Sequence, residues 1–276
     1  MSTSNSAMPI FKLGDHKLSK LIIGSNPIHG GSHLSRFVNN QMKEYFSPQR
    51  IQEFLSRCES LGINAWQGTP NGITAYREHR RAGGNLKFIS LVHDRGDNPA
   101  DLKALSSDGV IACAYHGEET DRLFKVGKLD DAKAYISKIR DAGMLAGVST
   151  HMPDVIDYVE SAGWEPDFYM TCVYERHRTR EELRELLGKV PLPLKEVYLE
   201  EDPPRMWAAI NKTDKPCLSF KILAAGRVCD RQKDVEEAFR TTFRNIKPND
   251  GVIVGMYPQY EDQAALNASY VESYGI

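Results

Sequence analysis

Short apolar runs recur along the chain, and the segments between them carry apolar residues with the spacing of amphipathic helices. Eight of these runs predict strands, at residues 18–25, 63–67, 86–92, 109–115, 145–149, 167–173, within 215–227 and at 251–256. Runs that are apolar on both faces are typical of parallel sheets covered by helices. The alternation predicts an α/β protein folded as a single (β/α)8 TIM barrel, with an open, doubly wound sheet as the alternative.

Capping residues mark the ends of the predicted helices. Ser47 and Pro48 suit the cap and the first turn of a helix that Gly62 closes. Further helices are predicted at residues 74–81, 129–142, 153–162, 180–187, 235–246 and 262–273, and others start near residues 98 and 202. The barrel is predicted to span residues 11–276, after a disordered N-terminal tail at residues 1–10.

One apolar run, KPCLSFKILAAGR at residues 215–227, contains a lysine at position 221. A lysine inside a buried strand is costly unless its ammonium group is paired or faces a polar cavity. In a closed parallel barrel that cavity is the mouth at the C-terminal ends of the strands. Lys221 therefore has three interpretations: a structural ion pair, an anchor for a phosphate or carboxylate, or an amine nucleophile that forms a Schiff base.

The composition excludes several classes of partner. The 276 residues are 41% hydrophobic and 26% charged, with a formal net charge of −2, which gives no electrostatic case for nucleic acid or an anionic membrane. No apolar run approaches the roughly 20 residues of a membrane span, and residues 1–8 lack the features of a signal peptide. The five cysteines have no C-x-x-C spacing and are expected to be reduced and buried, which favours a cytoplasmic location.

Chemically active side chains gather where the predicted strands end, and these positions converge on one face of a barrel. We expect them to contact a small-molecule substrate. The candidate catalytic residues are His116, Lys221, Glu175 and Tyr174. The candidate substrate-binding residues are Asn26, Gln67, His93, Arg227 and Tyr257.

Four of the eight histidines follow strands one, three, four and five. Imidazoles and a carboxylate on one rim suit a divalent transition metal, although no H-x-H or H-E-x-x-H spacing supports such a site. The candidate metal ligands are His29, His116, His151 and Glu175. In the alternative interpretation the histidines are hydrogen-bonded loop residues, and Glu175 is the ion-pair partner of Arg176 or Arg178.

Several segments resemble the aldo-keto reductase family. KPCLSFKILAAGR, DGVIVGM and YEDQAALNASYV, between residues 215 and 271, are similar to that family's seventh strand, eighth strand and final helix, which grip NADP. FKLG at residues 11–14 and LSKLIIG at residues 18–24 resemble its opening hairpin and first strand. The resemblance implies a (β/α)8 barrel and makes NADP the alternative cofactor.

The catalytic tetrad of that family is mostly missing. The resemblance places its aspartate at Gln67 and its lysine at the end of strand three, where this chain has Val92 and His93, and only its histidine is matched, by His116. Gly72 holds the place of its tyrosine, with Tyr76 displaced by about one helical turn. Without the lysine and aspartate, nothing lowers the pKa of a tyrosine for proton donation during hydride transfer.

Three functions remain open. The favoured one is an enzyme, a lyase, isomerase or hydrolase, that acts on a small polar oxygenated substrate such as a sugar or sugar acid by acid/base proton transfer, with or without a metal. In it His116 is the acid or base and Lys221 holds or polarises a carbonyl or carboxylate. The alternatives are an NADP-dependent oxidoreductase with a rebuilt tetrad, using Tyr76 or Tyr257 with His116, and a catalytically inactive ligand-binding barrel.

Overall fold

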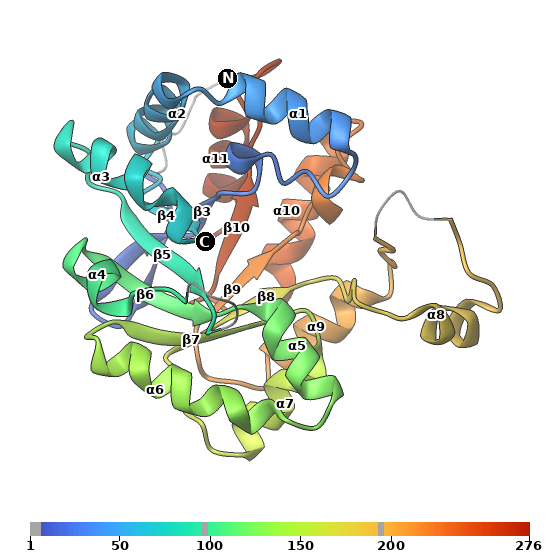
Figure 1. The fold of residues 1–276 in the computed structure, drawn as a ribbon. Helices are drawn as coiled ribbons and strands as arrows, with labels where there is room; N and C mark the ends of the chain where they lie inside the picture. Colours follow the sequence, from blue (N-terminus) through green and yellow to red (C-terminus); the bar gives the residue numbers. More distant parts are fainter. Residues whose placement is uncertain (1–6, 95–98, 193–195) are drawn as a thin grey trace.

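In a computed structural model, which describes residues 7–94, 99–192 and 196–276, eight parallel strands close into a barrel (Figure 1). Around the barrel they are β3 (Leu21–Gly24), β4 (Ala65–Gly68), β5 (Lys87–Val92), β6 (Val110–Tyr115), β7 (Leu145–Thr150), β8 (Phe168–Cys172), β9 (Cys217–Phe220) and β10 (Gly251–Gly255). β10 pairs with both β9 and β3, which closes the ring. The predicted (β/α)8 barrel is confirmed, and the open sheet is wrong.

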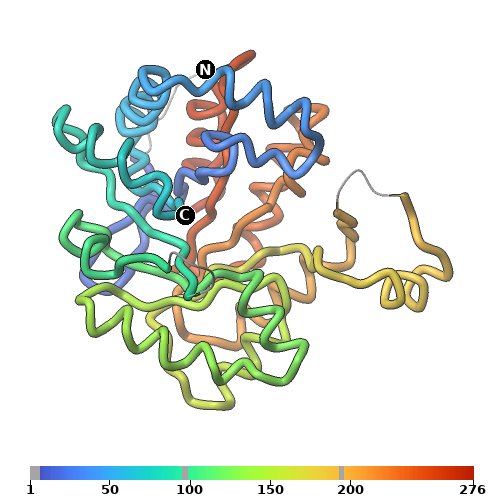
Figure 2. Tube along the Cα trace, in the orientation of Figure 1, coloured from blue at the N-terminus to red at the C-terminus, as the bar shows by residue number. Residues whose placement is uncertain are grey.

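Helices surround the barrel, and α8 stands out to one side of it (Figures 1 and 2). They are α1 (Arg36–Tyr45), α2 (Pro48–Ser60), α3 (Ile73–Arg81), α4 (Leu102–Ser107), α5 (Gly117–Lys125), α6 (Lys133–Asp141), α7 (Pro153–Ser161), α8 (Arg180–Leu187), α9 (Asp202–Ile210), α10 (Gln232–Asn245) and α11 (Gln263–Tyr274). Short 3₁₀ helices are η1 (Pro27–His29), η2 (Pro70–Gly72), η3 (Leu129–Ala132) and η4 (Ala224–Gly226).

The sequence did not predict α1 or α5, and few apolar side chains of these two helices are buried. Met42 is the buried residue of α1, whereas α5 buries polar side chains that include Thr120 and Asp121. Asp101 caps α4, so this helix starts later than predicted, and residue 98 lies outside the described residues.

A hairpin closes the N-terminal end of the barrel. β1 (Ile10–Leu13) and β2 (His16–Ser19) pair in antiparallel fashion, and Phe11, Leu13 and Leu18 pack against the side chains inside the barrel. The single strand predicted at residues 18–25 is therefore two strands, separated at Lys20. Residues 1–6 of the predicted tail lie outside the described residues, but Ile10 belongs to β1. With this end filled, the C-terminal mouth is the end that can hold a site.

The core has two layers. One fills the barrel and includes Ile22, Ile89 and Phe168, and the other lies between strands and helices. Packing is tight at Gly147, where an added Cβ atom would lie 2.5 Å from the ring of Phe168. Among the described residues, no helix is both long and apolar enough to cross a membrane.

Four of the five cysteines are buried as expected. Cys113, Cys172 and Cys217 lie in strands, and Cys58 lies in α2. Cys229 differs from the prediction, since it is exposed in the loop before α10.

Candidate active site

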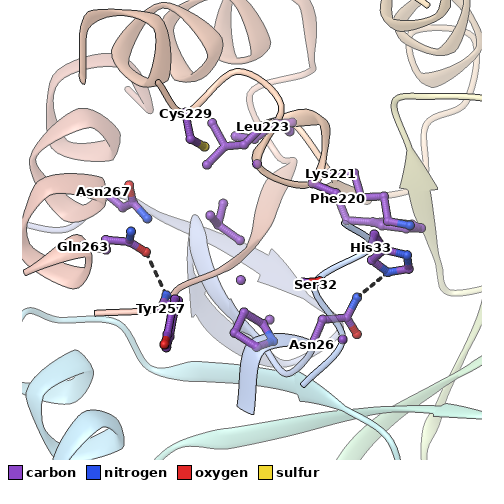
Figure 3. A pocket seen from close by; sticks show the side chains of 18 of the residues that line it. Asn26, Ser32, His33, Phe220, Lys221, Leu223, Cys229, Tyr257, Gln263 and Asn267 are labelled. Carbon is purple, nitrogen blue, oxygen red and sulfur yellow. Dashed lines mark hydrogen bonds between the residues drawn. The ribbon is translucent and has the colours of Figure 1, made fainter. Parts of the chain in front are cut away.

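A cavity of about 350 Å³ opens beside the mouth of the barrel (Figure 3). Its wall comes from the loops after β3, β9 and β10 and from helices α1, α10 and α11. Most of the wall is apolar. His33 and Lys221 lie at one side of the cavity, and Gln263 and Asn267 lie at the opposite side (Figure 3). The volume and the mixture of apolar walls with a few polar groups suit a small-molecule site.

Lys221 is the cationic residue of this cavity among the described residues. Lys221 was predicted to lie inside a buried strand, but it directly follows Phe220, the last residue of β9. Its ammonium group has no hydrogen bond or ion pair in the described part of the chain. Burial lowers the pKa of Lys221 to about 8; the Arg176 guanidinium acts in the same direction, while Cys172 and Glu196 oppose it. An amine with this pKa is partly neutral, and therefore nucleophilic, near pH 7.

The loops that border the cavity hold most of the backbone strain found in the described residues. Five residues other than glycine have a positive φ, and four of them lie in these two loops: His33 at 57°, Lys221 at 60°, Ala224 at 48° and Ala225 at 52°. The left-handed conformation costs a side-chain-bearing residue roughly 1–2 kcal/mol. Strain of this kind gathers at functional sites, where it aims particular side chains.

His33 is held by two polar neighbours. Its Nδ1 lies 3.0 Å from Oε1 of Glu196, and its Nε2 lies 3.0 Å from the amide nitrogen of Asn26. Since that amide group donates, Nε2 accepts, and the ring proton sits on Nδ1 and points to Glu196. The hydrogen bond with Glu196 raises the pKa of His33, but burial and the charges of Lys221 and Arg176 outweigh it, so the net pKa is lowered.

Glu196 and Tyr198 join side chains from several loops at the mouth. Glu196 accepts hydrogen bonds from the Arg176 guanidinium and, at 2.8 Å, from the hydroxyl group of Tyr198. Arg227 stacks 4.1 Å from the Tyr198 ring and donates to the backbone carbonyls of Glu196 and His33, each at 3.2 Å. Arg227 thereby ties the loops after β3 and β9 to the segment that contains Glu196 and Tyr198.

A second polar group lies at the ends of β7 and β8. One carboxylate oxygen of Asp121, Oδ2, lies 2.7 Å from Nδ1 of His151 and 3.1 Å from Nδ1 of His177. Burial lowers the pKa of His151 to about 3, although Asp121 raises it. Burial raises the pKa of Asp121, but its hydrogen bonds to both rings bring the net pKa below the ordinary value. The charge of Lys221, which lines the cavity, lowers the pKa of both His33 and His151.

The structure divides the predicted rim residues into those of the cavity and those outside it. Asn26, Gln67, Lys221 and Tyr257 line the cavity. The expectation that Lys221 would share one cavity with the rim histidines and Glu175 is not met, because this cavity lies toward β3, β9 and β10.

The histidines at β5 and β6 lie apart from the cavity lining. The rings of His93 and His116 lie 6.1 Å apart, and His116 caps α5 by accepting a hydrogen bond from the backbone amide of Glu118. His29 is an exposed residue of η1. Among the described residues, the group that could hold a metal ion is Asp121, His151 and His177. Of the four predicted metal ligands it contains His151, but it does not contain His29, His116 or Glu175.

Other candidates have structural partners. Glu175 pairs with Arg178 at 3.1 Å and Arg205 at 2.7 Å, which is the ion-pair interpretation left open above. Tyr174 packs against Tyr198, with ring centroids 5.1 Å apart. Arg227 was expected to bind substrate, but its guanidinium nitrogens donate hydrogen bonds to three backbone carbonyls, including that of Ala224.

Tyr76 is wrongly placed for the reductase alternative. Its side chain is fully buried in the helix–strand layer, and its hydroxyl group donates to the carbonyl of Gly109. This leaves Tyr257 as the tyrosine of the cavity.

Sequence reasoning missed His33, Glu196, Asp121 and His177. His33 carried one signal, the H-x-x-x-H spacing with His29 in a glycine-rich loop. Glu196 comes from a long connection without a regular pattern, and Asp121 and His177 follow their strands by several residues. Their side chains reach the mouth through tertiary packing, which the spacing along the chain does not encode.

Comparison with solved structures finds similar folds. The chain has a TM-score of 0.52 and 12% identity to a truncated 3-deoxy-D-arabino-heptulosonate 7-phosphate synthase from Thermotoga maritima, over 98% of this chain and 90% of that one. It has a TM-score of 0.54 and 13% identity to a phospho-2-dehydro-3-deoxyheptonate aldolase from the same organism, over 97% and 72%. A glycerol dehydrogenase from Gluconobacter oxydans has a TM-score of 0.46, at 12% identity over 80% and 66%, which is too weak to carry an argument.

No protein-family model matches the chain, and no curated protein matches it in sequence. At these identities the structural likeness shows the barrel fold alone.

Proposed function

We propose that this barrel is a lyase that makes or breaks a carbon–carbon bond in a small oxygenated carbonyl compound, through an imine with Lys221. The observation that carries the proposal is the half-buried amine of Lys221, which has no partner among the described residues and whose pKa is lowered to about 8 beside a cavity of small-molecule size. A structural lysine would be expected to have an ion-pair partner, and Lys221 has none in the described part of the chain.

The chemistry balances without a further reactant. The neutral amine of Lys221 attacks the carbonyl carbon, a C–N bond forms, and the carbonyl oxygen leaves as water to give an iminium ion. A base removes the proton of the hydroxyl group on the β carbon, and the bond between the α and β carbons breaks. The electron pair of that bond passes into the iminium ion and forms an enamine. Protonation of the enamine carbon and hydrolysis of the imine then release the second product and the free lysine.

His33 and Glu196 are the groups we assign to proton transfer. His33 lines the same cavity as Lys221, and its lowered pKa keeps the ring neutral near pH 7. Its Nε2 is an acceptor, and Glu196 holds the proton on Nδ1 and stabilises the imidazolium ion that forms. Asn26, which donates to Nε2 here, would be replaced by the substrate hydroxyl group.

Reductive trapping tests the proposal. The protein is incubated with dihydroxyacetone, glycolaldehyde or pyruvate and cyanoborohydride, and its mass is measured. We expect one adduct in the parent and none in Lys221→Met. Lys20→Met is the matched control, because Lys20 is also buried with a lowered pKa but lies at the closed end of the barrel. Equal trapping in the parent and in Lys221→Met, or no trapping with any of the three compounds, would contradict the proposal.

NADP-dependent reduction is the second candidate. It is favoured by the position of the cavity, which lies against the loops after β9 and β10 and against α11, the segments that resemble the reductase family. Tyr257 would be the proton donor. Among the described residues, Lys221 is the one lysine or arginine that lines the cavity. A single cation is little positive charge for the phosphate groups of a dinucleotide. Tight NADPH binding by fluorescence, with hydride transfer to a carbonyl compound, would favour this candidate.

A further inference from the structure

We propose that Asp121, His151 and His177 bind a divalent transition-metal ion. The three residues come from α5, from the end of β7 and from the segment after β8, and their ligand atoms lie within 4.8 Å of one another. The proposal goes beyond the lyase function and does not depend on imine formation by Lys221.

The separations are close to those of ligands around a common ion: the one to His177 lies in the expected range, and the one to His151 is shorter than that range. Oδ2 of Asp121 lies 2.7 Å from Nδ1 of His151 and 3.1 Å from Nδ1 of His177. Two ligand atoms that are each about 2.1 Å from one ion lie roughly 3.0–3.4 Å apart in octahedral or tetrahedral geometry. The ion would take the place of the two ring protons that now point at the carboxylate, and each ring would then carry its proton on Nε2 instead of Nδ1.

The surroundings orient these ligands. The other carboxylate oxygen of Asp121, Oδ1, accepts a hydrogen bond from the hydroxyl group of Thr150 at 2.6 Å, and the backbone amide of His151 lies 3.2 Å from both carboxylate oxygens. Outer contacts of this kind fix a ligating carboxylate and leave its second oxygen for the metal. The ring of His151 is also packed against Phe220, with centroids 5.5 Å apart.

The ligand types indicate the class of ion and its access. Two imidazoles and one carboxylate suit zinc, iron, cobalt or nickel better than magnesium or calcium, which prefer oxygen. Three protein ligands leave coordination positions open for water or a substrate oxygen. His177 is 24% exposed, whereas Asp121 and His151 are 2% and 4% exposed, so the ion would enter from the side of His177.

Cobalt binding to untagged protein tests the site. The protein is dialysed against a chelator, titrated with Co²⁺ and followed by visible absorption and elemental analysis. We expect one equivalent in the parent and at least about tenfold weaker binding in His177→Gln. The matched control is His116→Gln, which removes a neighbouring rim imidazole outside the cluster and should bind as the parent does. Since His177 is partly exposed, its variant should remain folded, and circular dichroism checks this.

The outcomes separate this site from the alternatives. A melting temperature that rises with Co²⁺ in the parent and in His116→Gln, but not in His177→Gln, supports the assignment. No cobalt binding by the parent, unchanged binding in His177→Gln, or loss of binding in His116→Gln would overturn it. Reductive trapping on metal-free protein reports on Lys221 separately, so failure of either proposal leaves the other standing.

Discussion

Replacing Lys221 with methionine should stabilise the protein near pH 7 while it abolishes trapping. Methionine has a similar length and is as apolar as the lysine stem, but it removes a half-buried ammonium group that lacks a partner among the described residues. A residue kept for its reactivity can lower stability in this way. A residue kept for an ion pair would have the opposite effect.

The size of the effect follows from the pKa of Lys221. The shift from 10.5 to about 8 corresponds to about 3 kcal/mol at roughly 1.4 kcal/mol per pKa unit, which is an upper bound for a half-buried group. Because the folded-state pKa is the lower one, both states are protonated below about pH 8 and the full cost is present there. Between pH 8 and 10.5 the folded state loses its proton first, and the cost fades.

Urea unfolding of the parent and of Lys221→Met, at intervals from about pH 7 to pH 10, measures this difference. The free energy of unfolding of the variant should exceed that of the parent by about 1–3 kcal/mol at pH 7, and the gap should narrow as the pH rises. Lys221→Arg keeps the charge and should show no gain. The charged and titratable groups that affect the pKa of Lys221 are Cys172, Arg176, Glu196 and Glu118. The charge of Lys221 in turn lowers the pKa of His33 and His151. A variant that is less stable than the parent at pH 7 would refute the reasoning, because Lys221 would then have a structural partner.

Three further outcomes are expected. The initial rate of trapping at Lys221 should rise with pH and level off above about pH 8, and a rate that still climbs at pH 10 would place the reactive amine elsewhere. His33→Asn and Glu196→Gln should still trap the carbonyl probe, but should cleave a β-hydroxy carbonyl substrate roughly 10²–10⁴-fold more slowly; equal losses in both assays would make their role structural. Gly147→Ala should lower the free energy of unfolding by about 1–3 kcal/mol, since its new methyl group would meet Phe168, and an unchanged midpoint in urea would show that the ring can move.

The barrel could be predicted from the sequence because its signals are local. Eight apolar runs are separated by helical segments with caps such as Ser47 before Pro48, and the structure has eight parallel strands in a closed ring. The predicted strand boundaries were less accurate where a polar residue interrupts an apolar run. Lys20 divides the first predicted strand into β2 and β3, and the strand before Lys221 ends at Phe220.

The site could be predicted only in part. Strand ends are fixed by the fold, so Asn26, Gln67, Lys221 and Tyr257 were found at the mouth and do line the cavity. The loops then decide which neighbours meet. Glu196 reaches His33 across 163 residues of sequence, and no local pattern marks that contact.

The separation of the rim histidines has the same cause. The ring of His151 contacts Asp121 in the middle of α5, while His116 caps the start of that helix. Glu175 is drawn to Arg178 and Arg205. These pairings depend on where each helix begins relative to its strand, which the spacing of apolar residues does not determine.

Peptide mapping of the trapped protein tests the central claim most directly. An adduct on Lys221 blocks trypsin there, and proline at position 216 protects the bond after Lys215, so the label should appear on the peptide of residues 213–227. The account predicts that this peptide carries the reduced adduct in the parent and in Lys20→Met. An adduct spread over surface lysines, with residues 213–227 unlabelled, would contradict it.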